Sequence, residues 1–135
     1  MAIIDKVLPA PAQTVVIVRL IVCALVFIHG VYRALSGGYA PFGEWLTSQQ
    51  VPFGPAVAIA VTAYEILAAP VLALGRFRRI LSIGFILIYI TGAIMVHLPN
   101  GWFVVGAGRN GVEYSVLVIL LFWLAGWTRN DTPAN

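Results

Sequence analysis

Residues 75–98 read GRFRRILSIGFILIYITGAIMVHL, and the uninterrupted apolar run from residue 80 to residue 98 decides the fold class. Its length is close to the roughly 20 mostly apolar residues that a helix needs to cross the hydrocarbon core of a bilayer. Lipid offers no hydrogen-bond partners, so a backbone in that core must form helices or a closed barrel. Because apolar and polar residues do not alternate here, the run predicts a membrane-spanning helix.

Three more runs of this kind occur, and the composition of the whole chain agrees with them. Of the 135 residues, 61% are hydrophobic and 10% charged. A water-soluble domain of this size cannot cover so much apolar surface with so few charges. The basic residues form no stripe suited to nucleic acid, so we expect no nucleic-acid partner. The sequence predicts an all-α integral membrane four-helix bundle, a single transmembrane domain (1–135) with spans at about 14–32, 54–74, 80–98 and 111–127.

The orientation of the bundle follows from the arginines that precede the third span. Arg76, Arg78 and Arg79 lie in a short connection, which the positive-inside rule places in the cytoplasm. That choice puts Lys6 and Arg129 on the same side. We therefore expect both termini to be cytoplasmic, in a multi-pass protein of the inner (cytoplasmic) membrane.

Two patterns concern packing rather than chemistry. The long outer connection, residues 33–53, contains the segment FGEWL (42–46), which predicts a short amphipathic turn at the membrane interface. Gly84 and Gly92 lie two turns apart on one face of the third span, a spacing that favours close helix packing there.

Ionisable side chains gather in the outer halves of the spans, where each is costly. His29 and Arg33 are four residues apart, so they share a helix face. Counted from the inner ends of their spans, His29 and His97 lie at similar heights of roughly 20–25 Å. We predict one polar pocket that opens outward and has Glu65 as its floor, with these cofactor-binding residues: His29, Glu65, His97, Arg109 and Glu113.

A structural explanation of the same residues stays open beside this one. Arg109 with Glu113, and His29 with a carboxylate, are also suited to pairs that fix the register of the bundle. Arg33 and Arg109 lie at the outer ends of spans, where arginine side chains often extend to the lipid headgroups. The same explanation applies to Arg19 near the inner end of the first span. Glu65 is expected to be protonated or to have a basic partner.

The order of several short blocks resembles the DoxX-like membrane proteins over residues 19–131. The blocks are Arg19 with FIHG (27–30), the segments 42–46 and 51–53, Glu65 with LGRFRR (74–79), HLPNGWF (97–103) and GVEY (111–114).

The resemblance implies a four-helix membrane bundle, and it supplies a functional context. Its members include a subunit of thiosulfate:quinone oxidoreductase and proteins linked to thiol-redox or oxidative-stress complexes. Glu65, His97 and Glu113 match the polar positions that mark the family. One departure concerns helix spacing, because Ala68 and Ala69 stand where the family commonly has a pair of glycines.

The leading functional hypothesis is a small membrane subunit associated with an oxidoreductase, which binds quinone in the outer pocket. A quinone site needs an apolar slot, donors near the carbonyl oxygens and a group that exchanges protons. The only cysteine is Cys23, which excludes a dithiol oxidoreductase working alone. An accessory subunit is therefore favoured over a stand-alone enzyme.

Three alternatives remain. The bundle is also suited to a non-catalytic anchor or assembly partner of a larger membrane or periplasmic complex. Haem ligation by His29 and His97 is not favoured, because two histidines at similar depth are a weak signal. Transport would need more spans than four, unless the protein forms oligomers. Besides lipid, the expected partners are other membrane subunits or further copies of the chain.

Overall fold

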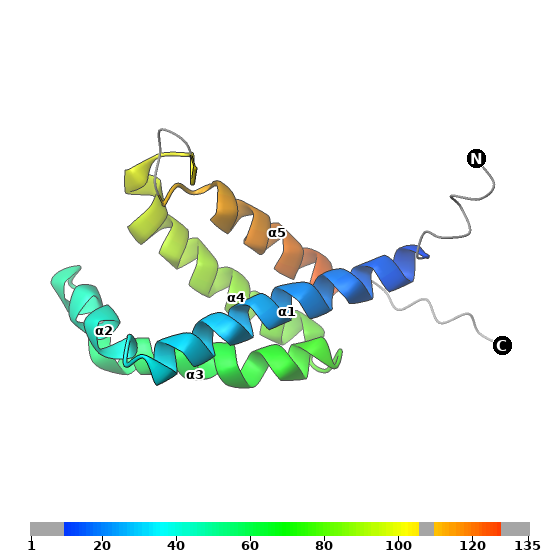
Figure 1. Cartoon of the computed structure of the whole chain (residues 1–135), viewed down its shortest axis with the longest axis horizontal. Helices are drawn as coiled ribbons and strands as arrows, with labels where there is room; N and C mark the ends of the chain where they lie inside the picture. The colour runs from blue at the N-terminus through cyan, green and yellow to red at the C-terminus, as the bar shows by residue number, and fades with distance from the viewer. Residues whose placement is uncertain (1–9, 106–109, 128–135) are drawn as a thin grey trace.

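The computed structural model describes residues 10–105 and 110–127, and all secondary structure within these ranges is helical (Figure 1). The elements are α1 (Pro11–Leu35), α2 (Tyr39–Ser48), α3 (Gly54–Ala73), α4 (Arg78–Gly92), the π-helical turn η1 (Ala93–His97), the 3₁₀ turn η2 (Leu98–Asn100) and α5 (Glu113–Trp127).

The membrane-protein class predicted from the apolar runs is confirmed by three helices. α1, α3 and the continuous segment 78–100 are each long and apolar enough to cross a bilayer. α5 is apolar too, but its 15 residues measure about 22 Å at roughly 1.5 Å per residue, less than the ~30 Å core. The fourth crossing and the cytoplasmic position of both ends therefore stay predictions; Lys6 and Arg129 lie outside the described residues.

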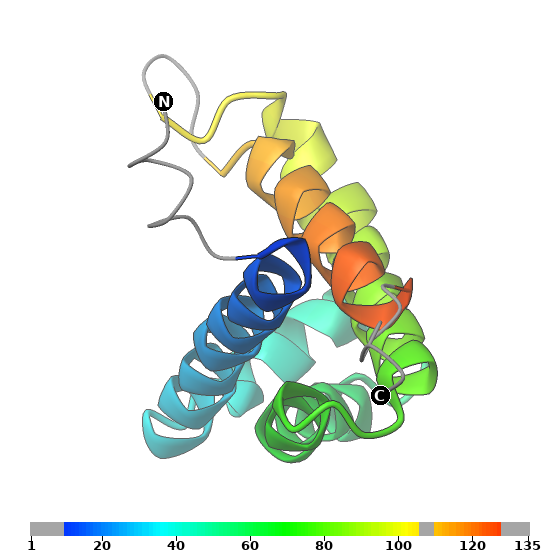
Figure 2. The same cartoon turned by 90° about the vertical axis from the view of Figure 1, so that its right-hand side faces the viewer.

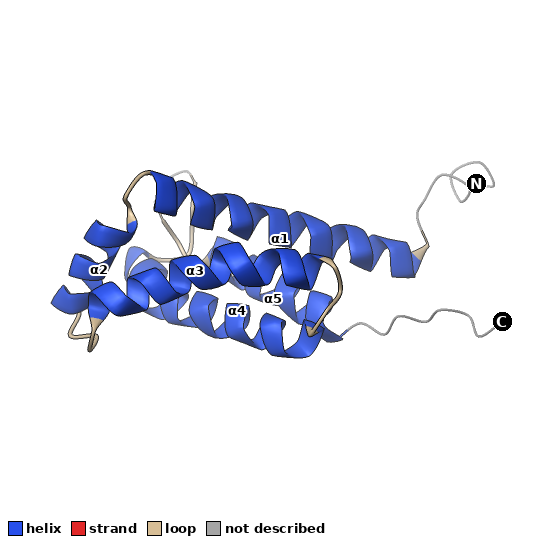
Figure 3. Cartoon of the chain, turned by 90° about the horizontal axis from the view of Figure 1, so that it is seen from below, coloured by secondary structure: helices blue, strands red, loops and turns tan. Residues whose placement is uncertain are grey.

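The helices pack into an elongated bundle with two distinct ends (Figures 1 and 3). α1 packs along α3 and α5, α4 packs along α5, and α2 lies against α3. Seen end-on in Figure 2, α4 and α5 run side by side, and α1 and α3 form the rest of the bundle. α1 begins and α5 ends at the end that holds the connection between α3 and α4. We call this the arginine end, for Arg76, Arg78 and Arg79, and the opposite end, with α2, the α2 end.

Aromatic side chains form the centre of the core. The rings of Phe85 and Phe122 are stacked with centroids 4.4 Å apart, and Tyr64 meets Phe85 edge-on at 4.9 Å. Val22 and Leu72 complete this core without exposure to solvent. Large apolar side chains cover the outside of every long helix, among them Ile28, Leu67 and Ile80. That outer surface is suited to lipid rather than water.

Two glycines permit close approach between helices. A Cβ atom on Gly30 of α1 would lie 2.8 Å from Cβ of Glu65 on α3, and one on Gly84 of α4 would collide with the Tyr64 hydroxyl. The packing role predicted for Gly84 is thus confirmed. The same prediction for Gly92 is wrong, because no atom lies within 4 Å of a Cβ placed there. On α3, Ala68 and Ala69 are both buried in the core.

Candidate functional site

A cavity of about 390 Å³ lies at the α2 end, between α1, α2, α3 and the last turns of α4 with η1. Most of its wall is apolar and aromatic, including Trp45, Leu46 and Met95. Polar side chains occupy part of the wall: His29, Arg33, Glu65, Thr91, His97 and Ser115. A mostly apolar cavity of this size with a few polar groups is typical of small-molecule sites.

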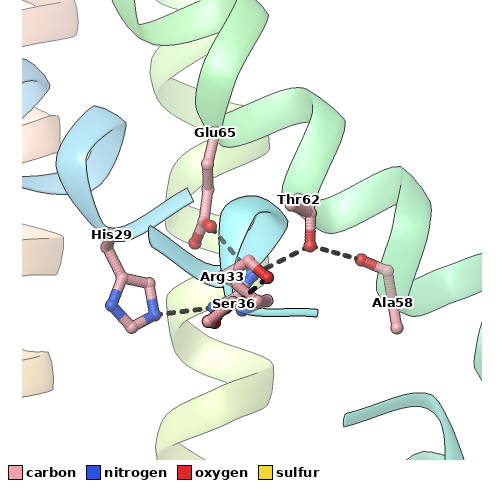
Figure 4. A network of polar contacts seen from close by, with 6 residues as sticks. All are labelled: His29, Arg33, Ser36, Ala58, Thr62 and Glu65. Atoms are coloured by element: carbon pink, nitrogen blue, oxygen red, sulfur yellow. Dashed lines mark hydrogen bonds and ion pairs between the residues drawn. The ribbon is translucent and has the colours of Figure 1, made fainter. Parts of the chain in front are cut away.

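Arg33 is the centre of the polar part of the site (Figure 4). Its Nη1 donates to Oε2 of Glu65 at 2.9 Å and to the Thr62 hydroxyl at 3.3 Å, and its Nη2 donates to Nε2 of His29 at 2.6 Å. The guanidinium also lies over the ring of Phe42, 5.0 Å from its centroid. One cation thus links α1 to α3 and to α2.

Local helix geometry explains how these groups meet. His29 and Arg33 lie one turn apart on α1, and Thr62 and Glu65 lie three residues apart on α3, so each pair shares a face. The Thr62 hydroxyl donates to the carbonyl oxygen of Ala58 at 2.7 Å, which leaves its oxygen free to accept from Arg33. Gly30, next to His29, brings the α1 backbone close enough for the contact with Glu65.

Glu65 has the basic partner that its depth in the span required. Its side chain is 3% exposed and that of Arg33 is 16% exposed. An isolated carboxylate would be strongly destabilising at such a position, whereas a hydrogen-bonded ion pair is tolerated. The pair therefore supplies structure and also places charged groups in the cavity wall.

The hydrogen bond to Arg33 fixes the tautomer of His29. A guanidinium nitrogen can only donate, so Nε2 of His29 accepts and the ring proton is on Nδ1. Haem ligation through Nε2 of His29 would require this contact to break.

His97 reaches the cavity from the other side, through an unusual turn. It closes η1, and π-helical turns are rare and occur frequently at functional sites. Its Nδ1 lies 2.7 Å from the carbonyl oxygen of Asn110, an atom that only accepts, so Nδ1 carries the proton. Within residues 10–105 and 110–127, no hydrogen bond involves its Nε2. His97 thus anchors the connection before α5 and keeps one nitrogen available.

Three of the predicted site residues, His29, Glu65 and His97, line this one cavity. Glu113 does not line it; its Oε1 accepts a hydrogen bond of 2.8 Å from the backbone N–H of Val104 and holds the connection between η2 and α5. Arg109 lies outside the described residues.

The expectation that Arg33 reaches outward to lipid headgroups is wrong. Arg33 turns inward because Glu65, Thr62 and His29 together offer acceptors that the end-of-span argument ignored. Arg19 also departs from its expected outward direction, since it is 6% exposed. The spacing of His29 and Arg33 signalled a shared face, but only packing shows that this face meets α3.

Sequence reasoning also missed the aromatic wall of the cavity. The segment 42–46 was expected as an interfacial turn, and it lies within α2. Its Phe42 and Trp45 stack with centroids 6.3 Å apart, and both line the cavity. The amphipathic pattern was the available signal, because an apolar face must pack on something.

Apolar spanning helices around a partly polar cavity define a multi-pass helical membrane protein with a candidate small-molecule site. A model of the DoxX family matches residues 14–98, well over half of the chain. The protein belongs to the DoxX family. Neither a curated protein nor a solved structure matches the chain significantly.

Proposed function

We propose that the cavity binds the ring of a quinone, and that the protein acts as a small membrane subunit of an oxidoreductase. The observation that carries the proposal is the cavity wall itself. An apolar and aromatic slot is combined there with the Arg33–Glu65 pair and with His97, whose Nε2 has no partner among the described residues. Arg33 offers donors to a quinone carbonyl oxygen, and Nε2 of His97 donates to such an oxygen when the ring is protonated and accepts from a quinol hydroxyl when it is neutral.

The polar groups divide into two roles under this proposal. Arg33 has donor hydrogens beyond those used by Glu65, Thr62 and His29, because a guanidinium carries five. It supplies positive charge close to a carbonyl oxygen. His97 and Glu65 are able to exchange protons, and conversion of a quinone to a quinol takes up protons as well as electrons. The electrons come from the associated redox subunit.

The decisive experiment fills the cavity without touching its polar groups. Gly92 lines the cavity, and a Cβ added there meets no atom within 4 Å. The side chain of Gly92→Leu therefore enters the ligand space. We expect this variant to lose the binding of a short-chain quinone that the purified wild type shows. Trp fluorescence or a thermal-shift assay measures that binding.

The matched control adds volume on the lipid side of the same helix. Ile83 of α4 is exposed and does not line the cavity, so Ile83→Phe should bind quinone like the wild type. Equal quinone binding by Gly92→Leu and the wild type would contradict the proposed site.

A second candidate function, a non-catalytic anchor or assembly partner, is favoured by one surface. The connection after η2 exposes Trp102, Phe103 and Val105 to 54%, 60% and 76%. An exposed apolar segment at the end of a membrane bundle suits a contact with another polypeptide. Native mass spectrometry of the protein released gently from its membrane distinguishes the two functions. A retained polypeptide without quinone favours the anchor, and bound quinone favours the cavity.

A further inference from the structure

Arg19 is a buried cation without a partner among the described residues. It lies on α1 near the arginine end, and it is 6% exposed. Its Nε and Nη1 are buried, and neither forms a hydrogen bond with a described residue. A buried guanidinium without hydrogen bonds is costly, so its presence calls for an anion that completes it.

Among the described residues, the charged neighbour of Arg19 is another arginine. The guanidinium of Arg19 lies against Gly75 in the connection between α3 and α4, with Nη2 3.4 Å from a Cβ built on that glycine. Arg78, the first residue of α4, is close enough for its charge to repel that of Arg19. The first turn of α4 contains no acidic residue and has no side-chain cap, so its N-terminal dipole also favours an anion.

The described acidic residues lie away from the arginine end of the bundle. They are Glu44 on α2, Glu65, which pairs with Arg33, and Glu113 at the start of α5. The site of Arg19 is therefore separate from the cavity at the α2 end.

We propose that Arg19 and the connection between α3 and α4 bind the phosphate of an anionic phospholipid. A guanidinium donates charge-assisted hydrogen bonds to phosphate oxygens, and basic clusters between helices at the membrane surface bind anionic headgroups. The apolar neighbours favour a lipid over a free anion. Leu74 and Phe77, on either side of Gly75 and Arg76, are 77% and 72% exposed, and they offer a surface for acyl chains.

The test compares wild-type protein with Arg19→Met in a nonionic detergent, with thermal unfolding as the readout. Added phosphatidylglycerol should raise the melting temperature of the wild type, and phosphatidylcholine should not. In titrations, Arg19→Met should weaken the apparent affinity for phosphatidylglycerol about tenfold or more. Arg79→Met, which removes an exposed arginine from the first turn of α4, should weaken it about fivefold or less.

Without lipid, Arg19→Met should be at least as stable as the wild type, because methionine removes an unpaired buried charge. An equal response of both proteins to phosphatidylglycerol would overturn the proposal. An equal rise with inorganic phosphate alone would overturn the assignment to lipid.

A carboxylate of the chain itself, Asp5 or Asp131, is the alternative partner for Arg19. Variants of these two residues therefore provide the remaining control. If Asp5→Asn or Asp131→Asn destabilises the wild type but not Arg19→Met, the partner is that carboxylate and the proposal is wrong. If Arg19→Met does not fold, Arg19→Lys replaces it. Lysine keeps the charge and loses the guanidinium, so a response to phosphatidylglycerol equal to that of the wild type would again overturn the proposal.

Discussion

Arg33 of α1 and Glu65 of α3 form an ion pair, with 2.9 Å between Nη1 and Oε2, at a position where Glu65 is almost fully buried. The pair joins α1 and α3, the helices that precede and follow α2 in the sequence, and both residues line the cavity. The same two side chains therefore join the helices at the α2 end and form part of the cavity wall.

Removal of one partner of this pair should be strongly destabilising. Arg33→Met leaves the Glu65 carboxylate buried and unpaired, and a loss of about 3–5 kcal/mol in unfolding free energy is expected. The double variant Arg33→Met/Glu65→Leu should recover most of that loss, because it removes both charges. Denaturant titration of the purified protein in detergent gives the values. A double variant no more stable than Arg33→Met would contradict the pairing.

Gly30 should tolerate no side chain, whereas Gly92 should tolerate a methyl group. In Gly30→Ala, the new Cβ lies 2.8 Å from Cβ of Glu65, so α1 and α3 must separate. A cost of about 1–3 kcal/mol is expected from this overpacking. Gly92→Ala serves as the matched control and should be neutral or stabilising by up to about 1 kcal/mol, because alanine favours a helix. Melting temperatures of the two variants test the contrast; equal values would refute it.

The two nitrogens of His97 should be separable by substitution. The Nδ2 of an asparagine occupies a position like that of Nδ1, so His97→Asn should keep the contact with the Asn110 carbonyl. It lacks the nitrogen that remains available in the cavity, and quinone binding should weaken about tenfold or more. His97→Gln should show the reverse pattern, with retained binding and faster hydrogen exchange in residues 101–105. Loss of both properties in both variants would mean that the roles do not separate.

Glu113 should matter for the connection before α5 and not for the cavity. Glu113→Ala removes the acceptor of the Val104 N–H and should cost about 1 kcal/mol. Glu113→Gln retains an acceptor oxygen and should behave like the wild type. Limited proteolysis of the connection detects the difference. Quinone affinity should be unchanged in both variants, and a large loss would show that Glu113 acts as a ligand after all.

The fourth crossing can be tested with a reporter at the C-terminus. If α5 spans the membrane and the arginine end faces the cytoplasm, a fluorescent protein fused after Asn135 folds and fluoresces in the cytoplasm. If the fluorescent protein is dark and a periplasmic reporter fused at the same position is active, that terminus lies outside the cytoplasm.

The positions of the helices were largely predictable, because continuous hydrophobicity is a local property. The run at 54–74 corresponds to α3 at Gly54–Ala73, and the run at 80–98 falls within the helical segment 78–100. The direction in which a side chain points was not predictable in the same way. Arg33 was assigned by its position at a span end and Glu113 by its position relative to Arg109, and the structure gives each a different partner.

The candidate site was predictable in part for the same reason. His29, Glu65 and His97 were found because ionisable residues are conspicuous in an apolar helix. The cavity wall of α2 was not found, since the amphipathic pattern of residues 42–46 does not show whether Phe42 and Trp45 face lipid or a cavity. The π-helical turn before His97 leaves no local sequence signal either.

That turn makes the position of His97 depend on residue number as well as residue identity. A π-helical turn accommodates one residue more than an α-helical turn. Deletion of a single residue from Ala93–His97 would convert this turn to an α-helical one and leave the residues beyond it on the same side of the helix. A deletion within the regular part of α4 removes no surplus residue, so each residue beyond it, His97 included, would rotate by about 100° around the helix axis. In alignments of this family, a one-residue gap within residues 93–97 therefore keeps the histidine in the cavity wall, whereas the same gap within residues 78–92 relocates it without replacing it.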